Sequence, residues 1–228
     1  MKTSFINTLL LSSILIGVSS TSSCQKTDFG PNNNATNSSA LAANNMLAQI
    51  QNLPIEPINE AERNSLILMR EEEKLARDIY LAMYNKWGAN IFNNISSSEQ
   101  THMDAVLSIL KKYQIADPIE NNSPGEFQNT TLKNLYTVLL AKGSSSISEA
   151  YQVGATIEDL DISDLNKIKS DVDNQDILFV YGMLTKGSRN HLRSFYKNIQ
   201  NSGNTYTPQY ISKEEFDSIV GSPMETGY

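Results

Sequence analysis

The sequence predicts an all-α protein: a four-helix bundle with an extra helix in the connection between the second and third core helices. Apolar residues recur at intervals of three and four over most of residues 58–199. No stretch of the chain shows the sustained alternation that is typical of a half-buried strand. The chain has 228 residues, which is enough for one domain with its own core and for additional terminal segments.

Four principal helices are expected, and their ranges are 58–86, 96–114, 146–160 and 174–199. Serines near residue 96 are suited to cap the second helix and Ser146 the third, because a serine side chain accepts hydrogen bonds from free N–H groups. The extra helix covers "TLKNLYTVLLAKG" and is closed by Gly143. Residues 162–170 are expected to add a turn or two before the fourth helix.

The N-terminus is typical of an exported protein. Residues 1–23 contain one lysine, an apolar run and small polar residues, which predicts a signal peptide that is too short to span a membrane. Cys24, the single cysteine, resembles the lipid-modified first residue of a bacterial lipoprotein. We therefore expect a protein attached to the bacterial cell envelope by this lipid only. The alternative is a soluble periplasmic or secreted form.

Composition divides the remaining chain into three parts. Residues 24–55 are expected to form a tether, which is flexible over residues 25–45 because these are rich in Asn, Ser, Thr and Ala. Residues 44–54, "NNMLAQIQNLP", are suited to a short helix that ends at Pro54. Residues 56–200 form the predicted bundle, and residues 201–228 form a polar C-terminal tail. The formal net charge of −7 argues against nucleic acid as a partner.

Polar residues interrupt the apolar stripes that these helices turn toward the core. Glu99 and His102 do so in the second helix, and His191 does so in the fourth. Buried carboxylates must pair, take up protons or bind a metal, because an unpaired buried charge is costly. Carboxylate oxygens with a few imidazoles favour iron or manganese. The corresponding residues of the first and third helices are Glu73, Glu158 and Asp161.

Two ligand assignments stay open at this point. Glu72 lies on a neighbouring stripe that is as apolar as that of Glu73, so either can be the first-helix ligand. Asp161 is also suited to cap a following helical turn. For the two histidines, hydrogen bonding to buried carboxylates is the alternative to metal binding.

Four segments resemble the ferritin-like di-iron carboxylate superfamily, and rubrerythrin in particular. They are "EKLARDIY" from Glu73, "EQTH" from Glu99, Glu158 itself, and "SRNH" ending at His191. Over roughly residues 60–200 the chain also resembles a ferritin-like family of prokaryotic domains of unknown function. The resemblance implies two metal ions, iron or manganese, inside a four-helix bundle. The ligands it implies are Glu73, Glu99, His102, Glu158 and His191.

The sequence departs from the rubrerythrin pattern in two ways. Ser188 stands where the last Glu-x-x-His motif has Glu, which removes a carboxylate from the second metal unless Asp161 replaces it. The alternative is a site that holds one metal ion or binds the second weakly. No Cys-x-x-Cys pair is present, so a redox cycle requires an external electron donor. Tyr80 and Tyr151 lie on inward stripes and are expected either beside the ligands or as core aromatics with a polar hydroxyl.

Two functions follow from this pattern. The first is an oxidoreductase or iron-handling protein that reacts with peroxide or oxygen, or that oxidises ferrous iron. The second is a non-catalytic lipoprotein, a binding or sensor module with a structural metal or none. Formation of a homodimer stays open.

Overall fold

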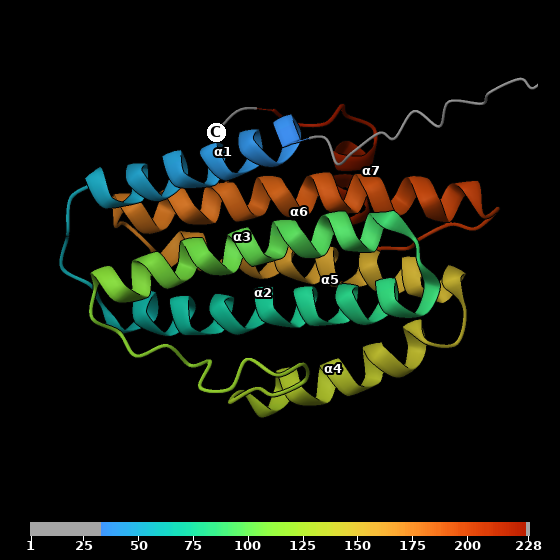
Figure 1. Ribbon diagram of the computed structural model, residues 1–228, viewed down its shortest axis with the longest axis horizontal. Coiled ribbons are helices and arrows are strands. Elements are labelled where there is room, and N and C mark those ends of the chain that lie inside the picture. Colours follow the sequence, from blue (N-terminus) through green and yellow to red (C-terminus); the bar gives the residue numbers. More distant parts are fainter. Residues whose placement is uncertain (1–32, 227–228) are drawn as a thin grey trace, which may run out of the picture.

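The computed structural model of the protein describes residues 33–226. This range contains seven α-helices, one short 3-10 helix and no strand, which confirms the all-α class (Figure 1). The predicted signal peptide, residues 1–23, and the predicted lipidation site, Cys24, lie outside the described residues. The elements are α1 (Asn33–Asn52), α2 (Glu60–Trp87), α3 (Asn90–Lys112), α4 (Thr130–Gly143), α5 (Ile147–Ile168), the 3-10 helix Lys169–Asp171, α6 (Gln175–Asn201) and α7 (Lys213–Val220).

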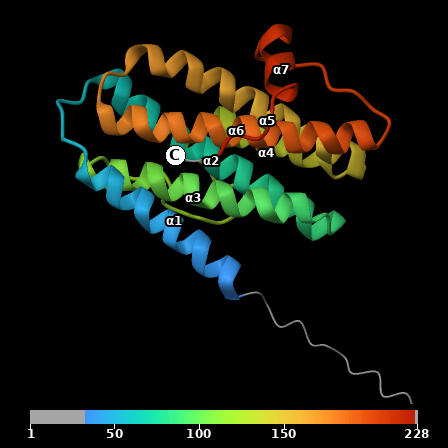
Figure 2. The same cartoon turned by 90° about the horizontal axis from the view of Figure 1, so that it is seen from above.

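Four long helices, α2, α3, α5 and α6, lie side by side (Figures 1 and 2). Helices α2 and α6 run in one direction and α3 and α5 in the other (Figure 1). The pairs α2–α3 and α5–α6 pack along their lengths, and contacts of α3 with α6 and of α2 with α5 join the pairs. The reversal between α2 and α3 takes two residues, because Gly88 adopts the left-handed conformation and donates its N–H to the carbonyl of Tyr84.

The long connection between α3 and α5 folds back over α2 and contains α4 (Figure 1). Periodicity predicts a solvated face with Glu71, Lys74 and Asp78, but the structure buries all three side chains. Glu71 accepts hydrogen bonds from the backbone N–H groups of Gln128 and Asn129, and Lys74 Nζ lies 2.5 Å from Asp78 Oδ2. These charges are buried because they satisfy the polar groups of the covering connection.

Helix boundaries differ from the predicted ones at two sites. Helix α3 begins at Asn90, so Ser96 and Ser97 lie inside it and donate to the carbonyl of Asn93 instead of capping. Helix α5 continues to Ile168, so Asp161 lies within the helix and does not cap a new one. Serine and aspartate occur both at helix caps and inside helices, so their presence alone does not locate a helix end. The packing of the surrounding helices determines where the helix ends.

The N-terminal segment differs from the expected flexible tether. Residues 33–52 form α1, which crosses α3 and α6 (Figure 2). Met46 and Ile50 are buried in the core, and Lys112 Nζ of α3 donates to the carbonyls of Ile50 and Leu53. The short helix expected within residues 44–54 is therefore the last part of α1, which begins earlier, at Asn33. Met46 and Ile50 lie one helical turn apart and so face the core together.

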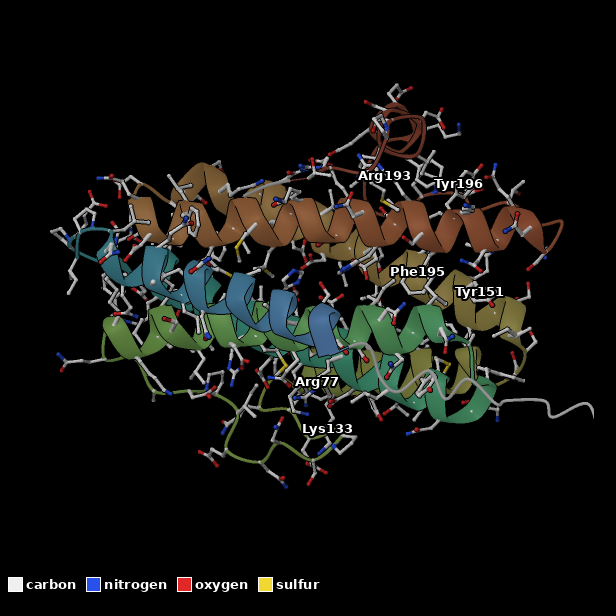
Figure 3. The ribbon with its side chains drawn as sticks, turned by 45° about the horizontal axis from the view of Figure 1, so that its top comes forward. Arg77, Lys133, Tyr151, Arg193, Phe195 and Tyr196 are labelled. Atoms are coloured by element: carbon white, nitrogen blue, oxygen red, sulfur yellow. The ribbon has the colours of Figure 1, made fainter. Side chains whose placement is uncertain are left out.

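The predicted polar tail also packs on the bundle. Phe216 and Ile219 of α7 are buried against α6, near the labelled Arg193 and Tyr196 (Figure 3). Asp159 of α5 accepts hydrogen bonds from the Tyr206 hydroxyl and from three backbone N–H groups of residues 209–211. One buried carboxylate therefore holds the segment that leads to α7.

The core consists of two apolar clusters at opposite ends of the four long helices. One contains Tyr80, Phe92 and Phe195, and the other contains Met69 and Tyr181. Between them each long helix contributes polar side chains, which form a buried polar layer. Among the described residues, no helix is both long enough and apolar enough to cross a membrane.

Candidate metal centre

The polar layer contains all five residues that the sequence predicts as the main ligands. Glu73 comes from α2, Glu99 and His102 from α3, Glu158 from α5 and His191 from α6, and each is at most 8% exposed. Glu99 and His102 point to the same side of α3 because residues three apart lie on one helical face.

Glu99 is the central residue of the cluster, because its two oxygens face two different histidines. Its Oε2 lies 2.7 Å from His102 Nδ1, and its Oε1 lies 2.9 Å from His191 Nδ1. Glu73 Oε2 approaches His102 Nδ1 to 3.1 Å, and Glu158 Oε2 approaches His191 Nδ1 to 3.4 Å. Each imidazole is therefore paired with Glu99 and with one further glutamate.

These residues form two ligand sets that share Glu99. The first set is Glu73, Glu99 and His102, and the second is Glu99, Glu158 and His191; in each, one ligand atom per residue lies within 4.8 Å of the others. The ring centroids of the two histidines are 5.7 Å apart. A carboxylate that offers one oxygen to each of two sets is placed to bridge two cations.

Several polar atoms in the sets accept or donate no hydrogen bond. They are Glu73 Oε1, Glu99 Oε1 and His191 Nδ1, and all are buried. The last two lie within bonding distance but are not aligned as donor and acceptor. Unsatisfied buried polar atoms are rare in folded proteins, and the donor set of oxygens and imidazole nitrogens suits iron or manganese. The residues present therefore fit a metal centre.

A cavity of about 20 Å³ borders the sets, which is room for about one water-sized particle. Five carboxylates line it, against two imidazoles in the polar layer. If all five were ionised, their negative charge would exceed that of two protonated imidazoles, so either protons on the carboxylates or bound cations must neutralise the excess. The lining carboxylates are those of Glu72, Glu73, Glu99, Glu158 and Asp161.

Burial and mutual charge shift the pKa values of these groups in opposite directions. Burial raises the pKa of Glu73 to about 8 although His102 opposes it. Burial also disfavours charge on Glu99, but His191 and His102 outweigh it and hold the pKa of Glu99 well below its usual range. Burial lowers the pKa of His191, but Glu99 and Glu158 outweigh it and raise that pKa to about 10. Without a metal, protons are therefore held between the imidazoles and the carboxylates, where a bound cation would replace them.

Two hydroxyl groups fix the orientation of ligands. Tyr80, predicted beside the ligands, donates to Glu158 Oε1 at 2.5 Å. Ser98 Oγ lies 3.1 Å from His191 Nε2, on the side of the ring opposite the carboxylates. Ser98 is not among the predicted site residues, because a cluster of serines is typical of a helix start. Its position immediately before Glu99 is the only sequence signal of this contact.

The remaining predicted residues divide between the site and the core. Ser188 donates to Asp161 Oδ2 and to the carbonyl of Leu184, so Ser188 and Asp161 lie beside the cluster but outside both ligand sets. Glu72 lines the cavity and also belongs to neither set, which leaves Glu73 as the α2 residue that faces a histidine. Tyr151 lies away from the cluster and stacks on Phe92, with ring centroids 5.6 Å apart (Figure 3 labels Tyr151 on α5).

Comparison with known proteins identifies the family. Residues 62–223 match the family described as "Uncharacterized protein domain (DUF2202)". The chain belongs to the DUF2202 family. The match includes the whole of the polar layer and the C-terminal segment with α7. The α1 helix precedes the matched range.

The crystal structure of one similar protein has been determined. The chain is similar to uncharacterized protein MJ0754 of Methanocaldococcus jannaschii, with 57% identity over 182 residues, which are 80% of this chain and 98% of the relative. The crystal structure of hypothetical protein MJ0754 from Methanococcus jannaschii DSM 2661 matches with a TM-score of 0.75. That match covers 76% of this chain and 99% of the solved chain.

Proposed function

We propose that this DUF2202 chain is a ferritin-like four-helix bundle that binds two metal ions, iron or manganese, between its central helices. The direction of α2, α3, α5 and α6 and the long connection through α4 support a ferritin-like arrangement (Figure 1). Export, and attachment to the cell envelope through a lipid on Cys24, are part of the same proposal and are supported by the N-terminal sequence.

The observation that carries the proposal is the position of Glu99 between the two histidines. Glu73, Glu99 and His102 would hold one ion, and Glu99, Glu158 and His191 would hold the other. Besides Glu99, each set has one glutamate of its own, Glu73 in the first and Glu158 in the second. Ser188 in place of Glu leaves the second set with fewer carboxylates than the rubrerythrin pattern.

When bound, a pair of iron or manganese ions would supply electrons for the reduction of peroxide or oxygen, or would accept them during oxidation of ferrous iron. The protein's residues position the ligands and exclude water. Tyr80 holds Glu158 and Ser98 holds the ring of His191. The apolar clusters on both sides of the polar layer lower the local polarity, which strengthens attraction between ligands and cations. Electrons would come from an external donor.

The test is a reaction assay on the protein reconstituted with ferrous iron under anaerobic conditions. We expect single-turnover oxidation of bound iron when peroxide or oxygen is added, followed by its optical absorbance. Glu99→Ala should abolish this reaction, because both sets lose a ligand. Glu120→Gln, an exposed carboxylate in the connection, should not alter it. Equal rates in wild type and Glu99→Ala would contradict the proposal.

A non-catalytic binding or sensor module is the second candidate, and one observation favours it. The shortest carboxylate–imidazole distances, 2.7 to 3.1 Å, are also those of ordinary charge-assisted hydrogen bonds. A structural ion, or protons alone, could then occupy the polar layer. Metal binding without any reaction toward peroxide, oxygen or ferrous iron would support this second function.

A further inference from the structure

The cavity beside the proposed centre has an acidic side that neither ligand set uses. Glu72 and Asp161 line this cavity but belong to neither set. Glu72 is only 8% exposed, and its Oε2 accepts no hydrogen bond. A buried carboxylate oxygen without a partner, on the wall of a cavity, is suited to receive a cation.

A third carboxylate continues this acidic side toward the solvent. Asp164 follows Asp161 by three residues on α5, so both lie on one helical face. Asp164 also acts electrostatically on Glu72. Its side chain is 22% exposed and pairs with the exposed Lys167 at 2.8 Å. Three carboxylates therefore form a row: Asp164 lies nearest the solvent, and Asp161 and Glu72 lie on the cavity wall.

A second groove reaches the centre from another side, and its lining differs from that of the cavity. This groove lies between α1, α3 and α6 and reaches His102, and the described residues that line it include no carboxylate. Its polar lining consists of hydroxyl groups, His102 and Lys186. Carboxylates that an incoming divalent cation can bind therefore line the Asp164 side of the centre and are absent from the described lining of this groove.

We propose that Glu72 and Asp161, with Asp164 at the solvent end, form a third, transient divalent-cation site through which metal ions reach the buried centre. This inference rests on the proposed function, since it concerns delivery to the same centre. Ser188 restrains Asp161 by donating to its Oδ2, while Glu72 keeps one oxygen unpartnered. The cavity holds about one small particle, so ions would pass singly.

The test measures how fast the metal-free protein takes up Co²⁺, followed by visible absorbance after rapid mixing. We expect Glu72→Gln and Asp164→Asn to slow uptake about 5-fold or more at low ionic strength. Glu72→Gln removes a buried carboxyl group that can release its proton when a cation arrives, and Asp164→Asn removes a negative charge near the surface. The final amount of bound Co²⁺ per chain should equal that of wild type. Asp171→Asn is the matched control, because Asp171 is exposed in the 3-10 helix and lines no part of the cavity.

The outcomes separate this inference from the proposed function. Wild-type uptake rates in both variants, with wild-type final binding, would overturn the transient site and leave the centre intact. A final amount lower by about one ion would show that Glu72 or Asp164 supports a resident ion, which also overturns a transient role. No uptake by the wild-type protein would remove the proposed centre and the third site together.

Discussion

At the scale of the residue, some members of the polar layer can be recognised from their sequence neighbours, and others only from their contacts in the folded protein. Glu99 and His102 could be predicted because they interrupt an apolar stripe three residues apart. The contact of Ser98 with His191 could not, because a serine in a serine-rich stretch is typical of a helix start and carries no sign of a histidine partner. The choice of Glu73 over Glu72 also required the structure, since both stripes are equally apolar.

Gly187 gives a direct test of the His102 position. A Cβ atom at Gly187 would lie 2.5 Å from His102 Cε1 and 2.7 Å from its Nε2. The ring cannot retreat easily, because Glu73 and Glu99 hold its Nδ1. We expect Gly187→Ala to weaken the binding of one ion about 10-fold or more, as changes in ligand-supporting residues commonly do.

The measurement for Gly187→Ala is a titration of metal-free protein with Co²⁺. Gly182→Ala is the matched control in the same helix, since no atom lies within 4 Å of the Cβ it would add. The control should bind as wild type does. Unchanged affinity in Gly187→Ala would show that the position of the His102 ring does not govern binding.

The Tyr80 hydroxyl gives a second test at this scale. Tyr80→Phe removes the donor to Glu158 Oε1 and leaves that buried oxygen with one partner fewer. We expect about 10-fold weaker metal binding and a loss of about 1 kcal/mol in the free energy of unfolding of the metal-free protein. Tyr84→Phe, in the same helix, is the control. A loss confined to stability, with unchanged metal affinity, would contradict a role for Tyr80 in holding Glu158.

At the scale of the element, periodicity predicted the helices well and their ends poorly. The core stripes of α2, α3, α5 and α6 follow from the spacing of apolar residues. The ends depend on side chains that suit both a cap and a helix interior, such as Ser96 and Asp161. Helix α7 and the first part of α1 were not predicted, because few apolar residues, such as Phe216 of α7, interrupt these polar segments.

The ion pairs of Glu225 predict how acid affects the C-terminal segment. Arg189 lowers the pKa of Glu225 to about 2, with Arg193 adding to the effect although partial burial opposes it. Because the folded pKa lies below the unfolded one, the stabilisation is present above about pH 4.5 and is lost as the pH falls toward 2. Glu225 is partly exposed, so the contribution is at most about 1 kcal/mol.

The corresponding measurement compares unfolding free energies of wild type and Glu225→Gln at pH 7 and near pH 2. We expect the variant to be less stable at pH 7 and equal to wild type near pH 2. Glu120→Gln should match wild type at both values. A difference between wild type and Glu225→Gln that persists unchanged in acid would show that packing, and not charge, explains it.

At the scale of the whole molecule, the chain places a layer of carboxylates and imidazoles between two apolar clusters. Such a layer destabilises a fold unless its charges are neutralised. A ligand that binds only the folded state stabilises it. Protons or cations must therefore neutralise the layer, and the relative MJ0754 offers a second chain of 57% identity in which to look for cations.

The most direct measurement of the central claim is the metal content of the protein after anaerobic reconstitution with ferrous iron or manganese. Two ligand sets predict about two ions per chain. The double variant His102→Ala/His191→Ala, with its helical content checked by circular dichroism, should lose them while the fold is kept. About two ions in wild type and almost none in a folded double variant would support the account. No bound metal in the wild-type protein would contradict it.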